Sequence, residues 1–142
     1  EFSTDPLTIK GDRDKLKQVF INLLNNAFDA IGEKGTIYIQ TSRSDDKKDI
    51  MISVMDTGHG IAREALEKIF DPFYSTKGPD KGTGLGLSVT FGIIREHRGD
   101  IKAYSPPKSK QLWETGAEFV VRLPKDSTAE KEGNHGKNSG SG

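Results

Sequence analysis

The segment that most constrains the fold of this chain is the run at residues 12–31. Asp12 is a favourable helix N-cap, Gly32 follows as a stop signal, and the run between them is long enough for about five helical turns. With about 100° of rotation per residue, the apolar side chains occupy an arc of roughly 140°. They are Leu16, Val19, Phe20, Leu23, Leu24, Ala27, Ala30 and Ile31. We expect this apolar face to pack on a sheet.

The remaining periodicities supply such a sheet. Residues 36–41 and 50–55 alternate apolar and polar side chains on either side of a polar turn at 42–48, which predicts an antiparallel hairpin. Further along the chain we expect a short helix at 62–69, a longer helix at 85–97, and strands at 100–104 and 118–123. This order predicts an α+β fold in which helices lie on one face of a mixed, mostly antiparallel sheet.

Two segments fall outside this pattern. Residues 71–84 are rich in glycine and proline, so we expect a mobile loop there. From Lys125 onward no aliphatic residue is larger than alanine, and such a segment buries too little surface to offset the entropy of ordering. We therefore expect one domain at residues 1–124 and a disordered polar tail at 125–142.

The composition excludes several classes of function. The 142 residues include 21 Lys and Arg against 21 Asp and Glu, so no overall charge attracts nucleic acid or an acidic membrane surface. The absence of cysteine excludes disulfide bonds and thiolate zinc sites, and suits a reducing compartment. No apolar run approaches the ~18 residues that cross a membrane. We expect a cytoplasmic domain that contacts neither nucleic acid nor membrane, whether or not its parent protein is membrane-anchored.

The polar face of the first helix has an unusual composition. Gln18, Asn22, Asn25, Asn26 and Asp29 lie within about 100° of one another. Each asparagine costs roughly 0.6 kcal/mol relative to alanine in a helix. An ordinary solvated face is one interpretation, but such a face normally carries Glu, Lys and Arg. A stripe of uncharged side-chain carbonyls instead suits a surface that coordinates a hydrated magnesium ion.

A second polar segment, DTGHGI at residues 56–61, leaves a predicted strand. The Asp56 carboxylate can accept a hydrogen bond from an exocyclic amine, and Gly58 and Gly60 allow the backbone to approach a ligand closely. The alternative is an ordinary Asp-x-Gly turn. His59 has no Ser, Cys or metal-ligand partner near it in the sequence, so we expect it to be a loop residue.

A third segment, GTGLGLS at residues 82–88, opens a predicted helix. The bare amides and the positive end of that helix favour binding of a phosphate. No Gly-Lys-Ser/Thr follows the glycines and the G-x-G-x-x-G spacing is missing, which excludes a P-loop and a dinucleotide-binding fold. A phosphate site of another kind remains.

Four ordered motifs carry a resemblance to a known family. The segments NLLNNAFDA, DTGHGI, FDPFYSTK and GTGLGLSV resemble the N, G1, F and G2 boxes of the catalytic domain of two-component sensor histidine kinases, from about Leu7 to Pro124. The resemblance implies the Bergerat fold, a two-layer α/β sandwich with a mobile ATP lid that is shared with gyrase, mismatch-repair ATPases and heat-shock chaperone ATPases. It also implies a protein-histidine kinase, a transferase of signal transduction that binds ATP or ADP with Mg²⁺.

The resemblance assigns roles to individual residues. By motif position, Asn26 resembles the magnesium ligand and Asp56 the residue that binds the adenine amino group. Asn22 and Lys77 resemble the catalytic residues that face the phosphates. The other residues that resemble nucleotide contacts are Gly58, Gly60, Ile61, Phe73, Thr76, Gly82, Thr83, Gly84, Leu85 and Gly86, with Lys77 also in this group. Ala117 departs from a frequent threonine, which leaves one of the family's polar contacts near the adenine unsupported.

Asn22 also bears on the type of reaction. Bergerat ATPases that hydrolyse ATP place a glutamate there as general base, and an amide cannot take a proton from water. We therefore expect transfer of the γ-phosphoryl group to a histidine on a dimerisation and phosphoacceptor domain of the same kinase, with a response regulator as an indirect partner. The alternatives are an ATP hydrolase fragment and a regulatory module that only binds nucleotide.

The three histidines bear on where the acceptor lies. The family's acceptor histidine precedes the catalytic domain on a helical hairpin, whereas His59, His97 and His135 all follow the first motif. His97 resembles a structural position near the end of a helix, and His135 lies in the predicted tail. We therefore expect the acceptor on a domain outside these 142 residues.

Overall fold

The predicted long helix is present as α1, Arg13–Ile31. The computed structural model describes residues 8–72, 74, 86–109 and 113–126. The Asp12 carboxylate caps α1 by accepting hydrogen bonds from the amides of Asp14 (3.0 Å) and Lys15 (3.1 Å). Gly32 ends the helix with a φ of 64°, a conformation that glycine adopts without steric cost. Both predicted ends of the helix are confirmed.

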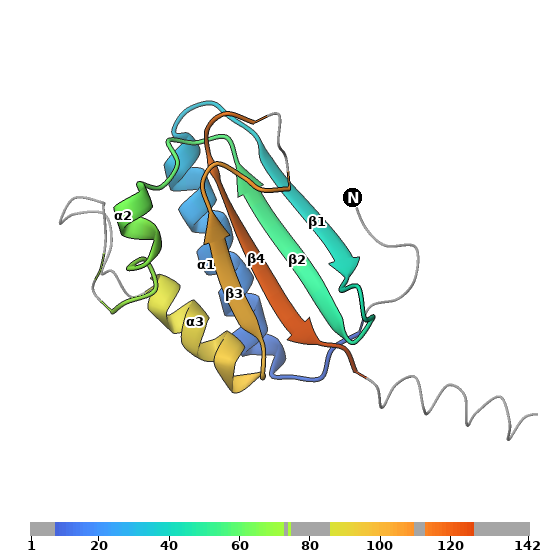
Figure 1. The fold of residues 1–142 in the computed structure, drawn as a ribbon. Helices are drawn as coiled ribbons and strands as arrows, with labels where there is room; N and C mark the ends of the chain where they lie inside the picture. The colour runs from blue at the N-terminus through green and yellow to red at the C-terminus, as the bar shows by residue number, and fades with distance from the viewer. Residues whose placement is uncertain (1–7, 73, 75–85, 110–112, 127–142) are drawn as a thin grey trace, which may run out of the picture.

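Four strands form one sheet in the order β1-β2-β4-β3 (Figure 1). The strands are β1 at Ile37–Arg43, β2 at Asp49–Asp56, β3 at Asp100–Tyr104 and β4 at Ala117–Pro124. The first two make the predicted hairpin, and β4 pairs with both β2 and β3. All three pairings among the described strands are antiparallel, so this part of the chain contains none of the parallel pairing that a mixed sheet implies.

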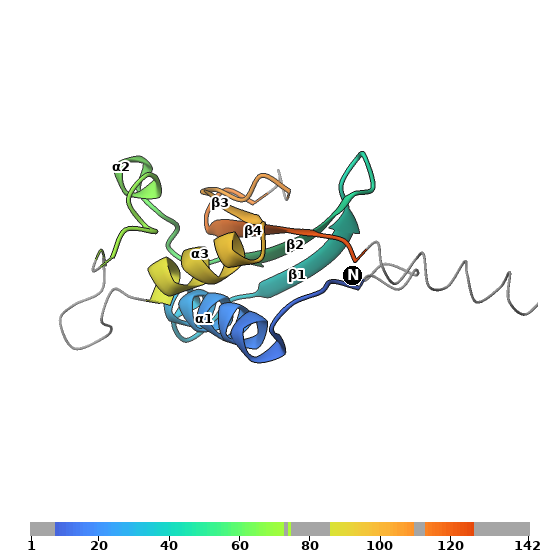
Figure 2. The ribbon, with the colours of Figure 1, turned by 90° about the horizontal axis from the view of Figure 1, so that it is seen from below.

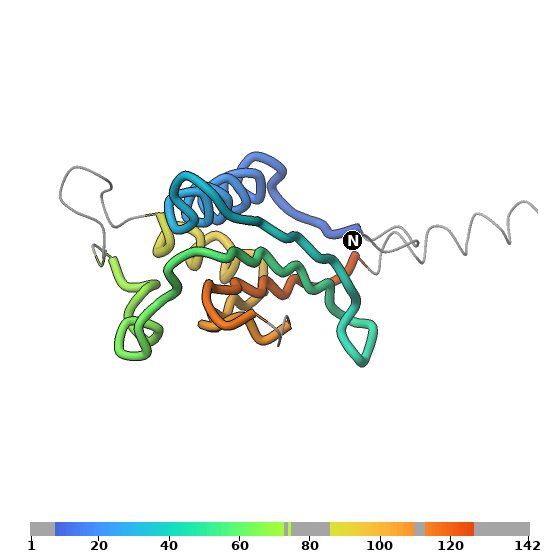
Figure 3. Tube along the Cα trace, turned by 90° about the horizontal axis from the view of Figure 1, so that it is seen from above, coloured from blue at the N-terminus to red at the C-terminus, as the bar shows by residue number. Residues whose placement is uncertain are grey.

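Helices α1 and α3 (Gly86–Glu96) cover one face of the sheet (Figures 2 and 3). The core between the two layers contains Val19 and Leu23 of α1 and Ile94 of α3, which pack with Phe119 and Val121 of β4. All five side chains are at most 1% exposed. Burial of each such side chain contributes about 1.5–3 kcal/mol. The predicted α+β class, with helices on one face of the sheet, is confirmed.

The helix predicted at 62–69 is much shorter in the structure, where α2 spans Arg63–Leu66. Ala62 occupies the N-cap position and makes no side-chain hydrogen bond to the first amides of the helix. Ala65 and Ile69 are nevertheless buried. The apolar spacing therefore predicted which side chains face the core, and the predicted helix length was wrong.

His97 joins the end of α3 to the start of α1. Its Nδ1 lies 2.7 Å from the carbonyl of Ile93, and its Nε2 accepts a hydrogen bond of 3.0 Å from the amide of Asp12. Because an amide can only donate, Nε2 carries no proton and Nδ1 is the donor to Ile93. This geometry agrees with the structural role that we expected for His97.

The β3–β4 connection lies on the side of the sheet away from α1 (Figures 2 and 3). Pro107 of this connection is buried. The Glu118 side chain, 0% exposed on β4, accepts hydrogen bonds from the amide and the hydroxyl of Ser109. A buried carboxylate needs such partners, because leaving it unpaired is costly. The connection is therefore fastened to the sheet before the chain enters β4.

The last described residues extend the sheet region slightly beyond the predicted domain boundary. The amide of Lys125 donates to the carbonyl of Lys48 (2.9 Å), and that of Asp126 donates to the carbonyl of Thr8 (2.8 Å). Residues 127–142, most of the predicted tail, lie outside the described residues. Among the residues that are described, no helix is both long and apolar enough to cross a membrane.

Candidate functional site

Asp56 is a buried carboxylate at the end of β2, with a side chain only 1% exposed. Its Oδ1 accepts a hydrogen bond of 2.9 Å from the amide of Gly58. Burial raises the pKa of the Asp56 carboxyl above its ordinary value of 3.8, although hydrogen bonds from the amides of Gly58 and Ala117 and the nearby His59 act in the opposite direction. A carboxylate held in such a place at a cost to stability is typical of a binding site.

The loop after Asp56 is attached to the end of α1. The amide of His59 donates to the carbonyl of Ala30 (3.2 Å), and Thr57 exchanges hydrogen bonds with the backbone of Thr36. A Cβ on Gly58 would lie 2.4 Å from the Ala30 carbonyl oxygen. Glycine is thus required here because the loop packs directly on α1, and the close approach of a ligand to Gly58 stays a prediction. His59 is an exposed loop residue, as expected.

The polar stripe of α1 faces the start of α3. The Gln18 side chain donates to Asn22 Oδ1 (2.7 Å). The Asn22 amide in turn donates to the carbonyl of Gly86 (3.2 Å) and to the hydroxyl of Thr90 (3.2 Å). Asn26 lies one turn further along the same stripe and is partly exposed. Asn22 is therefore not merely solvated, because its side chain links α1 to α3.

The structure brings the described site residues to the second half of α1, from Asn22 at its middle to Ala30 near its end. The described candidates are Asn22, Asn26, Asp56, Gly58, Gly60, Ile61 and Gly86. Gly86 is exposed in the first turn of α3, whose first amides lack partners within the helix. The remaining candidates, Phe73, Thr76, Lys77, Gly82, Thr83, Gly84 and Leu85, lie outside the described residues, as does nearly all of the predicted mobile loop.

The donor atoms at this site suit a magnesium nucleotide better than a bare metal ion. Within the described part of the chain, no three His, Cys, Asp or Glu side chains gather closely enough to hold a metal. Mg²⁺ commonly binds through one or two protein oxygens together with substrate phosphates and water. The side-chain oxygen of Asn26 is a hard donor of this kind, and the Asp56 carboxylate has acceptor positions beyond those that the amides of Gly58 and Ala117 use.

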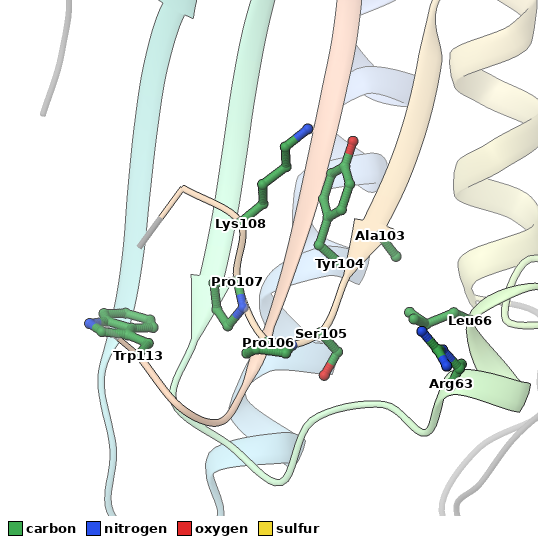
Figure 4. Close-up of a pocket in the computed structure, with 9 residues that line it drawn as sticks. All are labelled: Arg63, Leu66, Ala103, Tyr104, Ser105, Pro106, Pro107, Lys108 and Trp113. Atoms are coloured by element: carbon green, nitrogen blue, oxygen red, sulfur yellow. The ribbon is translucent and has the colours of Figure 1, made fainter. Parts of the chain in front are cut away.

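A separate open hollow lies beside the β3–β4 connection (Figure 4). Its lining residues are Arg63, Leu66, Ala103, Tyr104, Ser105, Pro106, Pro107, Lys108 and Trp113. None of these is a residue that the sequence singled out for nucleotide binding. Of this lining, Ser105 makes a hydrogen bond to the loop that follows Asp56.

Two residues near Asp56 were missed by the sequence-based reasoning. Gly116 has a φ of 103°, and a Cβ at that position would lie 1.9 Å from the carbonyl oxygen of Asp56. Ser105 accepts a hydrogen bond from the amide of Ile61 and donates one to the carbonyl of Gly116. The glycine two residues before the last predicted strand was a signal for a positive φ. No local pattern marked Ser105.

Comparisons with known proteins agree with this architecture. A model of the family described as histidine kinase-, DNA gyrase B-, and HSP90-like ATPase matches residues 11–127. Sporulation kinase A of Bacillus subtilis (strain 168) is 41% identical over 124 residues, which cover 87% of this chain and 19% of that protein. This chain therefore spans only a small part of that relative.

Two solved structures show the same fold. The catalytic domain of histidine kinase ThkA, in a nucleotide-free form, has a TM-score of 0.72 and 38% identity, covering 87% of this chain and 76% of that one. Histidine kinase ThkA in complex with response regulator protein TrrA has a TM-score of 0.69 and 35% identity, covering 88% of this chain and 33% of that one. The chain belongs to the histidine kinase-, DNA gyrase B- and HSP90-like ATPase family, and it has the Bergerat fold of the histidine kinase catalytic domain.

Proposed function

We propose that this chain binds Mg²⁺-ATP and donates the γ-phosphoryl group to a histidine on a separate dimerisation and phosphoacceptor domain. One observation carries the proposal: three motifs that are far apart in the sequence meet on α1. Asn22, at the middle of α1, bonds to Gly86 at the start of α3, and the loop after Asp56 packs on Ala30 near the end of the same helix. A base site and a phosphate site are thereby held at a fixed separation.

Asp56 is the base-binding residue in this proposal. The exocyclic amino group of adenine is a donor, and an ionised carboxylate is an acceptor only. Guanine has a carbonyl at the same ring position, so two hydrogen-bond acceptors, this carbonyl and the carboxylate, would face each other. Because Asp56 is buried, an unmatched acceptor there is poorly compensated by water. The site therefore favours ATP over GTP.

Asn26 and the start of α3 form the phosphate side. Asn26 would hold Mg²⁺ through its side-chain oxygen, and the ion, when bound, neutralises charge on the phosphates. The first-turn amides of α3 are hydrogen-bond donors for a phosphate, and the positive end of this 11-residue helix also attracts negative charge. Lys77 and the glycines at 82 and 84 belong to the same proposed site by motif position.

Asn22 supports phosphoryl transfer to an external acceptor over hydrolysis. Its amide is engaged with Gly86 and Thr90, and its carbonyl oxygen with Gln18. An amide cannot act as general base for an attacking water. Asn22 therefore does not activate a water for hydrolysis, which favours a kinase.

The partners follow from the same proposal. The acceptor histidine lies on a dimerisation domain of the same kinase, and the phosphoryl group passes from there to a response regulator. The complex of the related kinase ThkA with a response regulator supports such a partner. The balanced charge and the absence of cysteine support a cytoplasmic domain that does not bind nucleic acid.

Isothermal titration calorimetry tests the binding step. We expect saturable binding of ATP and ADP in the presence of Mg²⁺, and binding at least about tenfold weaker when Mg²⁺ is removed by a chelator, because a triphosphate then carries uncompensated charge. GTP serves as the control nucleotide and should bind more weakly than ATP. Absence of ATP binding with Mg²⁺ present would refute the proposal.

A further inference from the structure

We propose that Ser105 is a positioning residue for the base site: its hydroxyl holds the loop 58–61 and the Gly116 backbone around Asp56. This inference rests on the proposed nucleotide-binding function. Ser105 is the first residue after β3, between that strand and the segment that leads to α2 (Figure 4). It does not itself touch the proposed base, so any effect on binding passes through the backbone that it holds.

The Ser105 hydroxyl makes two hydrogen bonds to two different segments. It accepts from the amide of Ile61 at 2.9 Å and donates to the carbonyl of Gly116 at 2.6 Å. A hydroxyl has one donor and two acceptor positions, so this geometry uses its single donor. One side chain directly after β3 thus links the loop after β2 to the residue directly before β4.

Both linked segments are in close contact with the proposed site. Gly116 packs against the backbone of Asp56 so tightly that a Cβ there would lie 1.9 Å from the Asp56 carbonyl oxygen. Gly60, with a φ of 77°, would place a Cβ 2.8 Å from the Ser105 oxygen and 3.1 Å from the Gly116 carbonyl oxygen. The two glycines let the backbone at 60–61 and the backbone of Gly116 converge on one hydroxyl, with Gly116 packed against the backbone of Asp56.

The loop after Asp56 is therefore held at two points. His59 bonds to Ala30 of α1 on one side, and Ile61 bonds to Ser105 on the other. Between these points the chain has no helix or strand pairing of its own. Loss of the Ser105 hydroxyl leaves the Ile61 amide and the Gly116 carbonyl without this partner, and the loop loses its second anchor.

The experiment compares two variants of equal shape, Ser105→Thr and Ser105→Val, with wild type. Affinities for Mg²⁺-ATP and Mg²⁺-GTP are measured by calorimetry. We expect Ser105→Val to reduce the ratio of ATP to GTP affinity by roughly three- to tenfold, as the loss of a hydrogen bond predicts, and Ser105→Thr to stay within about twofold of wild type. Equal ratios for the two variants overturn the inference, whatever their stability.

A matched control separates positioning from general destabilisation. Ser109→Ala removes a serine hydroxyl from the same β3–β4 connection, but that hydroxyl bonds to Glu118 and not to the base loop. We expect Ser109→Ala to lower the melting temperature and to leave the ATP to GTP ratio unchanged. A ratio that falls equally in Ser109→Ala would show a general effect of the connection and overturn the specific role of Ser105.

Amide hydrogen exchange gives a readout that does not depend on nucleotide. In Ser105→Val we expect the Ile61 amide to exchange faster than in wild type, while the His59 amide, which bonds to Ala30, keeps its protection. Unchanged protection of Ile61 contradicts the inference. Wild-type protein that binds no ATP would refute the proposed function itself. If the wild-type protein prefers ATP and the Ser105 variants keep the same ratio of ATP to GTP affinity, only the role of Ser105 is refuted.

Discussion

The Asp56→Asn substitution is expected to weaken ATP binding and, at the same time, to stabilise the protein without nucleotide. Asparagine has nearly the same shape, and its side-chain oxygen can still accept the hydrogen bond from the Gly58 amide. The loop therefore keeps its attachment to the side chain. What changes is the other end of the side chain, where an NH₂ donor replaces a carboxylate oxygen and faces the adenine amino group.

The size of the binding effect follows from the hydrogen bond that is lost. A hydrogen bond to a charged group contributes about 1.5–3 kcal/mol, which corresponds to a loss of roughly 10- to 100-fold in ATP affinity. The affinity for GTP should fall much less, because the ring carbonyl of guanine can accept a hydrogen bond from the NH₂ group of the new asparagine. The ratio of ATP to GTP affinity therefore falls toward one or below.

The stability effect has the opposite sign because burial raises the pKa of Asp56. A raised pKa means that the folded state favours the protonated form, so the stability contributed by this group is present below the ordinary value of 3.8 and is lost as the pH rises through the folded pKa. At neutral pH the ionised carboxylate opposes folding. Asparagine removes that charge, and we expect a higher melting temperature in the absence of nucleotide.

The assay combines calorimetry with ATP and GTP and thermal unfolding without nucleotide. Asp46→Asn is the matched control, because Asp46 lies in the β1–β2 turn, away from the site. Hydrogen bonds from the Ser44 hydroxyl and the Lys48 amide lower the pKa of Asp46, which is the opposite direction to Asp56. This control should not raise the melting temperature or alter nucleotide preference. Asp56→Asn protein that keeps the wild-type ATP to GTP ratio would refute the base-binding role.

Three further substitutions test other parts of the account. Asn26→Asp adds a charge beside the proposed phosphates, and calorimetry should detect roughly tenfold weaker ATP binding at limiting Mg²⁺ with an unchanged melting temperature. His97→Ala removes the hydrogen bonds to Asp12 and Ile93, and urea unfolding should give a loss of about 1–2 kcal/mol without any change in nucleotide preference. Gly116→Ala forces a Cβ against the Asp56 carbonyl at a φ of 103°, and the same unfolding measurement should give a loss of at least about 2 kcal/mol.

The sequence predicted those elements whose signals are local. The Asp12 cap, the apolar spacing of α1 and the Gly32 stop all lie within one segment, and both ends of the helix agree with the structure. The alternation that predicted the first two strands was equally local. Helix α2 was overestimated because the apolar spacing of the helix continues past Leu66 into residues 67–70, which form turns.

The features that were missed depend on contacts between distant residues. The Ser105 bond to Ile61 spans 44 residues, and nothing in the sequence around either residue indicates it. Glu118 was predicted as part of a strand, but its complete burial depends on Ser109 in the preceding connection. At Ala117 the resemblance concerned only the side chain, which lacks the hydroxyl of the family's frequent threonine. In the structure the backbone amide of Ala117 donates a hydrogen bond to the Asp56 carboxyl.

Phosphoryl transfer in trans tests the central claim most directly. The chain is incubated with γ-labelled Mg²⁺-ATP, alone and with the dimerisation and phosphoacceptor domain of its own parent protein. We predict no label on the chain alone, and slow, acid-labile, alkali-stable labelling of the histidine on the added domain, slow because tethering is absent. Label on His59, His97 or His135 with ATP alone, or steady release of phosphate with none on the added domain, would contradict the account.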